Sequence, residues 1–139
     1  MKVEKIDRVS IMVNDLDNAV KFFSELLETE FTSLGDVEDM DLRSAVEPSG
    51  IEVVAPLSPD GASARTLKNR GEGLAMIALK VADIEQAMAE MKNRGIRLIG
   101  HSKTDTTEVA IYHPKDAFGV LIELVSYETK HPVATAMGK

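Results

Sequence analysis

Cysteine is absent from this chain of 139 residues, and no long apolar run occurs in it. Without cysteine the chain has no disulfide bond, no thiolate metal site and no cysteine nucleophile. The apolar runs are far too short to span a bilayer, and residues 1–5 do not lead into an apolar stretch of signal-peptide length. We therefore expect a cytoplasmic protein that does not have a membrane as its partner.

Basic residues are also scarce, because 16 lysines and arginines stand against 23 aspartates and glutamates and give a formal net charge of −7. Proteins that bind nucleic acid along its backbone normally carry clustered basic surface. We therefore expect no nucleic-acid partner, although this charge leaves room for a local basic pocket. The apolar fraction of 44% is ordinary for a globular protein, and the length suits one domain or two half-sized modules with a common core.

Internal duplication is the main feature that the sequence does have. Residues 7–20 and residues 75–88 both read as an alternating apolar strand, an acidic turn and an amphipathic helix. Residues 51–54 and 122–125 share a second pattern at a slightly larger spacing, so the second half has gained a few loop residues. Two copies are too few for a solenoid and indicate a pseudo-symmetric domain.

Each copy is predicted to be a βαβββ unit, and the copies span about residues 5–56 and 73–126. The first contains strands over 6–13, 30–34, 39–46 and 51–56 and a helix over 16–27 capped by Asp15. The second contains strands over 74–81, 97–100, 108–112 and 120–126 and a helix over 84–94, from the cap Asp83 to the stop Gly95. A linker over 57–72 with a short helix over 62–69 joins the copies, and a polar tail over 127–139 follows. The predicted fold class is α+β, a single domain whose tandem βαβββ units form a cupped mixed β-sheet with flanking helices.

Periodicity sorts the side chains between a helix-covered face of each sheet and an opposite face that faces the cup. The helix residues expected to point inward are Leu16, Ala19, Val20, Phe23, Leu26 and Leu27 in the first copy and Ile84, Ala87, Met88 and Met91 in the second. The strand residues expected to face the cup are Arg8, Ser10, Met12, Glu52, Met76, Ala78, Lys80 and Glu123. Two carboxylates and a guanidinium should therefore meet inside the cup.

An ionised glutamate in an apolar strand is costly to bury, so Glu52 and Glu123 must face water, pair with a cation, bind a metal or stay protonated. Their symmetric recurrence beside Arg8 favours an internal ion cluster. The charge of this cluster is unbalanced by one, so either one glutamate is protonated or Lys80, a metal or a ligand completes the set. In the alternative interpretation both glutamates lie on a solvated sheet face, with Arg8 as a surface partner worth under about 1 kcal/mol.

The duplicated pattern and four motifs resemble the vicinal oxygen chelate superfamily, which includes glyoxalase I, bleomycin-resistance proteins, extradiol dioxygenases and methylmalonyl-CoA epimerase. Among these classes the epimerases are the most similar. The resemblance covers Ile6 to about Tyr127. The motifs are Ile6-Asp7-x-Val9 with Val13-x-Asp15-Leu16, Ile51-x-Val53-Val54-Ala55-Pro56-Leu57, Arg70-Gly71-Glu72-Gly73-Leu74, and His113-Pro114-Lys115 with Gly119-Val120-Leu121-Ile122-Glu123-Leu124-Val125.

The resemblance implies a divalent metal held by four cup-facing positions, which in the family carry His, Gln or Glu, His and Glu. In this chain the four positions are Arg8, Glu52, Met76 and Glu123, so both histidines are replaced. A guanidinium has no lone pair to offer a cation, and a thioether is too soft for the hard divalent metals. We therefore expect no metal cofactor, in contrast to the family.

The resemblance leaves three functions open. The first is a metal-free isomerase or lyase that acts next to a carbonyl, with Arg8 as electrophile, Glu123 as base and Glu52 as its partner. The second is a non-catalytic ligand-binding or resistance-type protein, in which Arg8 simply neutralises the carboxylates. The third is a true metal-dependent methylmalonyl-CoA epimerase or lactoylglutathione lyase-like enzyme.

In all three cases the expected partner is a small carboxylate or an acyl-CoA-type thioester, and family members often form homodimers. Contacts with the phosphates of a CoA-type ligand are one interpretation of the basic residues Arg65, Lys68, Arg70 and Lys115. Arg65 and Lys68 are explained equally well as part of an ordinary solvated helix face. The residues predicted to bind the ligand are Met76, Ser10, Lys80, Arg70, His113 and Lys115.

Overall fold

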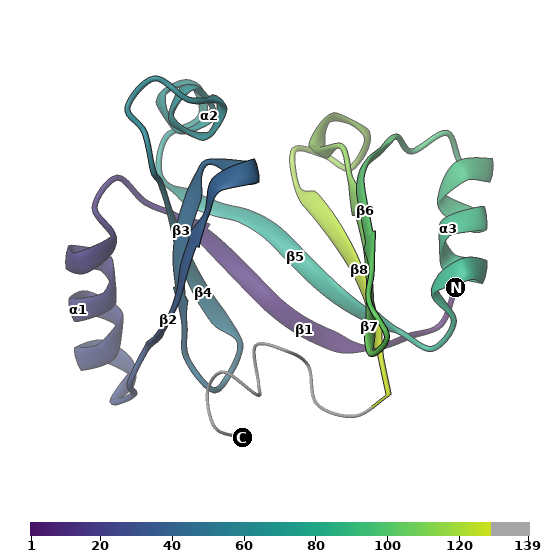
Figure 1. Cartoon of the computed structure of the whole chain (residues 1–139), viewed down its shortest axis with the longest axis horizontal. Coiled ribbons are helices and arrows are strands. Elements are labelled where there is room, and N and C mark those ends of the chain that lie inside the picture. Colours follow the sequence, from purple (N-terminus) through teal and green to yellow (C-terminus); the bar gives the residue numbers. More distant parts are fainter. Residues whose placement is uncertain (129–139) are drawn as a thin grey trace. The chain divides into compact units, whose positions relative to one another are not determined.

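The computed structural model describes residues 1–128 and has an α+β fold, with three α-helices and eight strands in that part of the chain (Figure 1). The α-helices are α1 (Leu16–Leu27), α2 (Ala62–Arg70) and α3 (Ile84–Asn93). The strands are β1 (Val3–Met12), β2 (Thr32–Val37), β3 (Leu42–Val46), β4 (Ile51–Pro56), β5 (Gly73–Val81), β6 (Leu98–Lys103), β7 (Thr107–Tyr112) and β8 (Leu121–Tyr127). In residues 1–128 no helix is both long and apolar enough to cross a membrane. The predicted tail begins one residue too early, because Tyr127 ends β8, and the rest of it from residue 129 on lies outside the described residues.

The chain divides into two compact units, and strand β1 contributes to both. In the described part of the chain the early unit contains residues 10–74, and the late unit contains residues 1–9 together with residues 75–128. The strand order is β2–β3–β4–β1 in the early unit and β1–β5–β8–β7–β6 in the late unit. Strands at equivalent places of the two sequence copies thus occupy equivalent places in the sheets, as expected from a duplication.

The early unit is built from the two antiparallel pairs β2–β3 and β3–β4, with β1 beside β4. Helix α1 packs on β3 and β4, and Figure 1 shows it on one face of these strands. The tight turn between β3 and β4 depends on Glu47, which is 3% exposed and accepts hydrogen bonds from the backbone N–H groups of Ser49 (3.0 Å) and Ile51 (2.8 Å). The core of this unit comes from small and β-branched strand residues: Ala45, Val46, Val53, Val54 and Ala55.

The late unit has a parallel pair, β5–β8, followed by the antiparallel pairs β8–β7 and β7–β6. Helix α3 covers one face of these strands, and its buried residues are Ile84, Ala87 and Met91, as predicted. They join a core cluster with Val81, Ala110, Tyr112 and Leu124, against which Met88, Leu79 and Ile122 pack. The apolar faces assigned to these elements from periodicity are therefore confirmed.

Both predicted helix caps are confirmed. Asp15 and Asp83 have extended backbones, and their side chains accept hydrogen bonds from the N–H groups of Asn18 and Gln86, each at 3.0 Å. Such caps satisfy backbone donors that have no partner within the helix. Gly95 takes the positive φ of 74° that the predicted stop of the second helix requires.

The inward face predicted for the first helix is wrong in part. No residue of α1 is buried, and Leu26 and Leu27 are 62% and 40% exposed. Helix α1 rests mainly on β3 and β4, so its apolar stripe is wider than the surface that covers it.

Several predicted strand bounds also need correction. Strand β2 spans Thr32–Val37 rather than 30–34, and β3 begins at Leu42 because Glu38–Met40 forms a 3₁₀ turn that ends in the left-handed Asp41 (φ 54°). At the other edge β6 spans Leu98–Lys103 rather than 97–100, with a register shift between Leu98 and Gly100. Strand β1 begins at Val3 rather than residue 6 and ends at Met12.

Gly61 provides a direct test of packing in the early unit. It is the N-cap of α2, and a Cβ atom there would lie 1.6 Å from Oδ2 of Asp41. Asp41 is fixed by hydrogen bonds from the N–H (3.1 Å) and the hydroxyl (2.9 Å) of Ser58. We expect Gly61→Ala to lower the free energy of unfolding by about 1–3 kcal/mol, measured by urea denaturation. In Asp41→Gly/Gly61→Ala the clash with Asp41 is gone, so this double variant should lose less free energy of unfolding than the sum of the two single losses. A Gly61→Ala protein as stable as the parent would contradict the packing.

A bidentate ion pair between Arg97 and Asp116 ties the start of β6 to the short 3₁₀ helix η2 (Pro114–Asp116). Nε of Arg97 lies 2.8 Å from Oδ2 of Asp116, and Nη2 lies 3.1 Å from Oδ1. The hydrogen bonds from this side chain, joined by the backbone N–H of Arg97, lower the pKa of Asp116 from 3.8 to about 2.

Because the folded pKa of Asp116 lies below its unfolded value, its contribution to stability is present above pH 3.8 and is lost as the pH falls toward 2. We expect Asp116→Asn to flatten the acid limb of the stability curve in this window, measured by urea denaturation at stepwise pH. Arg97→Gln should flatten it in the same way, since it removes the guanidinium. An unchanged acid limb in both variants would show that the pair does not hold this carboxyl.

Candidate functional site

The centre of the candidate site in the late unit is a buried ion pair. Nη2 of Arg8 in β1 donates to Oε1 of Glu123 in β8 over 2.9 Å, and the two residues are 9% and 7% exposed. Ile122 and Leu124 pack toward α3, so alternation along β8 turns Glu123 to the opposite face of the sheet. The two sequence-predicted charges are thus brought together, and the interpretation of Arg8 as a surface partner is wrong because both groups are withdrawn from water.

Arg8 keeps one donor that the described residues do not satisfy. Its Nε atom is fully buried and has no hydrogen-bond partner in that part of the chain. An unsatisfied buried donor costs free energy, and proteins usually give such groups a water or a ligand atom. The guanidinium therefore has one N–H group without a partner among the described residues, in addition to the bond that it makes with Glu123.

The early unit holds the second predicted carboxylate, Glu52, next to Ser10. The hydroxyl of Ser10 donates to Oε1 of Glu52 over 2.5 Å, and the residues are 3% and 7% exposed. Glu52 lies in β4 opposite Val46 of β3, between strand residues that form the core. Because Glu52 is buried and accepts a hydrogen bond from Ser10, its carboxylate is held in a fixed direction and does not lie on a solvated sheet face.

Lys80 and Met76, both on β5, differ in their surroundings. Nζ of Lys80 lies 2.7 Å from Oε2 of Glu4 and 4.6 Å from the ring centre of Tyr127. The hydroxyl of Tyr127 donates to Asp7 over 2.6 Å, and burial together with this bond raises the pKa of Tyr127 to about 12. Lys80 is therefore held by Glu4, a partner that the sequence analysis did not consider. Met76 is half-buried and pairs with Leu121 across the parallel strands.

The other three predicted ligand-binding residues lie in turns or at a helix end. Nδ1 of His113 accepts a hydrogen bond from the backbone N–H of Lys115 (3.1 Å), so the imidazole caps η2. The side chain of Lys115 is exposed, and so is that of Arg70 at the C-terminal end of α2. The structure gives His113 a local structural role that the motif alone did not reveal.

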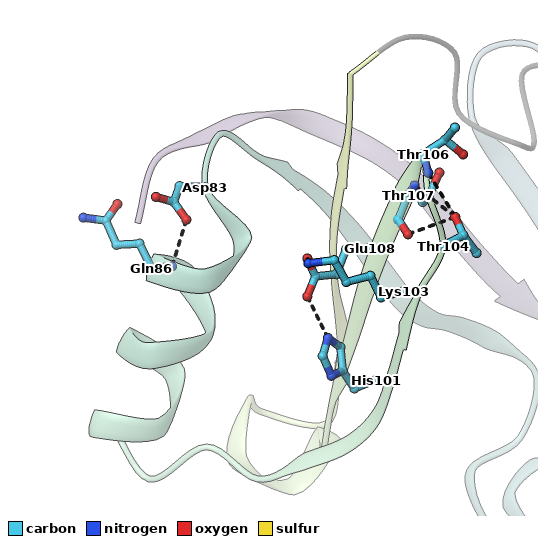
Figure 2. Close-up of polar contacts among 8 residues, drawn as sticks. All are labelled: Asp83, Gln86, His101, Lys103, Thr104, Thr106, Thr107 and Glu108. Carbon is cyan, nitrogen blue, oxygen red and sulfur yellow. Dashed lines mark hydrogen bonds and ion pairs between the residues drawn. The ribbon is translucent and has the colours of Figure 1, made fainter.

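A separate polar cluster lies on the hairpin between β6 and β7 (Figure 2). Nε2 of His101 lies 2.8 Å from one carboxylate oxygen of Glu108, and Nζ of Lys103 lies 3.2 Å from the other. The hydrogen bond with His101 and the charge of Lys103 lower the pKa of Glu108. Thr104 closes the turn, since its hydroxyl accepts from the backbone N–H groups of Thr106 and Thr107. This cluster stabilises the hairpin at the edge of the late sheet.

The described residues do not include a cluster of three or more histidines, cysteines or acids that could hold a metal ion. At Arg8 and Glu123 the donor set is one carboxylate and one guanidinium, which repels a cation. These residues do not fit a divalent metal.

The α+β fold and the strand order place the chain in a known class of proteins. Residues 7–127 match the family described as the Glyoxalase/Bleomycin resistance protein/Dioxygenase superfamily, and the chain belongs to this superfamily. The family resemblance predicted from the sequence motifs is thereby confirmed.

Within the superfamily the chain is similar to methylmalonyl-CoA epimerases. It is 28% identical over 131 residues to the mitochondrial methylmalonyl-CoA epimerase of Homo sapiens, and the match covers 86% of this chain and 72% of that protein. The crystal structure of methylmalonyl-CoA epimerase from Mycobacterium tuberculosis gives a TM-score of 0.77 at 30% identity, over 91% of this chain and 90% of the other. A methylmalonyl-CoA epimerase in complex with methylmalonyl-CoA and NH4+ gives a TM-score of 0.78 at 27% identity, over 92% and 97%.

The Arg8–Glu123 pair has a measurable signature in stability. We expect Arg8→Met and Glu123→Leu each to lower the free energy of unfolding by about 3–5 kcal/mol, because each leaves a buried charged partner behind. The double variant Arg8→Met/Glu123→Leu should lose much less free energy of unfolding than the sum of the two single losses. A double-mutant cycle by urea denaturation measures this difference.

The exposed pair of Lys21 and Glu25 on α1, 3.3 Å apart, is a matched control in which we expect a much smaller coupling. If the coupling of Arg8 with Glu123 did not exceed that of this control pair, the buried pair would not be formed in solution.

Proposed function

We propose that this protein binds a malonyl-type acyl-CoA thioester or a related small carboxylate and moves the proton on the carbon next to its carbonyl without a divalent metal. The observation that carries the proposal is the buried Arg8–Glu123 pair with its open Nε donor, in a chain similar to methylmalonyl-CoA epimerases. The reaction class is that of an isomerase of the epimerase type.

The charge and the hydrogen bonding of Arg8 support a role as electrophile. Removal of a proton next to a thioester carbonyl places negative charge on the carbonyl oxygen, and a preorganised donor aimed at that oxygen lowers the barrier. The guanidinium is permanently charged and is already held by Glu123, so it needs little reorganisation when the substrate binds. In this proposal the N–H at Nε of Arg8 donates to the enolate oxygen.

The carboxylate of Glu123 is the proposed base, and the role predicted for Glu52 in the early unit stays a prediction. One carboxylate takes the proton from carbon, the electron pair moves onto the thioester oxygen, and return of a proton to the same carbon from a carboxyl group completes the epimerisation. In the early unit the hydroxyl of Ser10 fixes one carboxylate oxygen of Glu52. No oxidant or further reactant is needed.

The absence of a metal belongs to the proposal as well. The two positions at which the family carries histidines hold Arg8 and Met76 in this chain, and neither side chain binds a hard divalent cation well. We also propose that Met76 and Lys80 lie against the bound thioester, and that Arg70, His113 and Lys115 take part in binding the CoA portion. Homodimer formation, which is common in the family, stays a prediction.

A binding protein without catalysis is the second candidate. The observation that favours it is that Arg8 already neutralises Glu123, so the buried charges of the late unit are compensated without a ligand. A protein of this kind would bind the thioester through the same Nε donor and would leave its α-proton in place.

Deuterium exchange tests the proposal. We expect the protein, after treatment with EDTA, to incorporate deuterium from D2O at the α-carbon of methylmalonyl-CoA, followed by mass spectrometry. Arg8→Met should slow the exchange by about 10²–10³-fold because it removes the proposed donor, and Glu123→Gln should slow it similarly. Glu25→Gln on the exposed surface of α1 serves as the control and should exchange like the parent.

The same assay separates the three functions. Binding of methylmalonyl-CoA by calorimetry without exchange would favour the binding protein over the isomerase. Stoichiometric divalent metal in the purified protein, together with loss of exchange in EDTA, would overturn the metal-free mechanism. If the parent shows no exchange, gain of metal-dependent exchange in Arg8→His/Met76→His would identify a site that has lost its metal.

A further inference from the structure

A pocket of about 440 Å³ lies in the late unit beside α3, and the proposed reaction does not use it. Its lining consists of Met88, Ala89 and Lys92 from α3, Ile96 from the following loop, Leu98 from β6 and Tyr112 from β7. Tyr112 pairs with Ile122 in the register of β7 with β8, and both belong to the side of the sheet that packs on α3. The pocket therefore lies on the helix-covered face, opposite to the face on which Glu123 lies.

The walls of this pocket are mostly apolar. Met88 and Ile96 pack against the core of the late unit, and Leu98 leaves 46% of its surface exposed at the edge strand. Figure 1 shows α3 alongside the outer strands of this sheet. The volume and the apolar lining are typical of sites for small molecules, in which a few polar groups fix the orientation of the ligand.

Two polar groups of the pocket are available for a ligand. Tyr112 is 2% exposed, burial raises the pKa of its hydroxyl, and no described residue hydrogen-bonds to that hydroxyl. Lys92 is exposed, and its ammonium has no ion-pair partner in residues 1–128, whereas the neighbouring Arg94 is bound to Glu90 at 3.1 Å. The pocket thus combines an apolar wall, a neutral hydroxyl donor and an uncompensated cation.

We propose that this pocket binds a linear medium-chain carboxylate, with its alkyl chain against Met88, Ile96 and Leu98 and its carboxylate next to Lys92. An unbranched apolar chain matches the aliphatic side chains, and an anionic head matches the unpaired ammonium. The hydroxyl of Tyr112 donates a hydrogen bond to the ligand. This site is independent of the proposed thioester site, so the two can be tested separately.

Titration with hexanoate, octanoate and decanoate, followed by the methyl signals of the methionines in NMR, tests the site. We expect the Met88 signal to shift on titration, while Met91, which is 3% exposed in the adjacent core, stays unchanged. Each added pair of methylenes should tighten the Kd about tenfold or more until the pocket is full, because burial of one methylene is worth roughly a factor of four.

Three variants sharpen the test. Ala89→Trp places a large side chain at the rim of the pocket and should abolish the Met88 shift, whereas Asn93→Trp, a neighbouring α3 position that does not line the pocket, should preserve it. Lys92→Gln should weaken octanoate binding about two- to fivefold. The same variant should leave the binding of octanol unchanged, since this uncharged alcohol forms no ion pair with Lys92.

Three outcomes would overturn the proposal. The first is an unchanged Met88 signal up to the critical micelle concentration of decanoate. The second is an equal shift of Met88 and Met91, which would indicate non-specific partition into the core. The third is a lower sedimentation coefficient for Ala89→Trp than for the parent, which would show that a second copy of the chain covers this face.

Discussion

The burial of Arg8 against Glu123 is the constraint on which the late unit depends. Two charges lose their hydration there, and the loss is offset only while the guanidinium and the carboxylate stay in contact. That contact requires β8 to hold the register in which Glu123 pairs with Ala78, and it requires β1 to remain beside β5. One ion pair thus depends on the arrangement of three strands that are far apart in the sequence: β1, β5 and β8.

In the proposed function the same pair takes the place that a metal ion holds in the family. A guanidinium supplies one delocalised positive charge and directional N–H donors, whereas a metal ion supplies two charges and accepts lone pairs from every ligand. A ligand that is recognised by Arg8 must therefore offer an oxygen to a donor rather than a lone pair to a Lewis acid. The proposed metal-free proton transfer follows from this difference, and so does the alternative in which the protein only binds.

Local signals in the sequence predicted a large part of the fold. Asp15 and Asp83 were identifiable as caps because a short acidic side chain directly precedes an amphipathic run, and alternation on β8 placed Glu123 opposite the core residues Ile122 and Leu124. The exposure of Leu26 could not be predicted, since periodicity defines an apolar stripe but not the area of the sheet that covers it. The pairing of Lys80 with Glu4 was missed for a similar reason, because it joins residues whose proximity depends on strand order.

The division of β1 between the two units has a consequence for biosynthesis. Residues 1–9 are translated before residues 10–74, yet their neighbour in the late unit, β5, is complete only at residue 81, and Glu123, the partner of Arg8, follows later still. Residues 10–74 meanwhile already contain every strand that pairs within the early unit. Residues 1–9 therefore find their partners in the late unit only after the early unit has been translated, and Arg8 stays hydrated until Glu123 emerges.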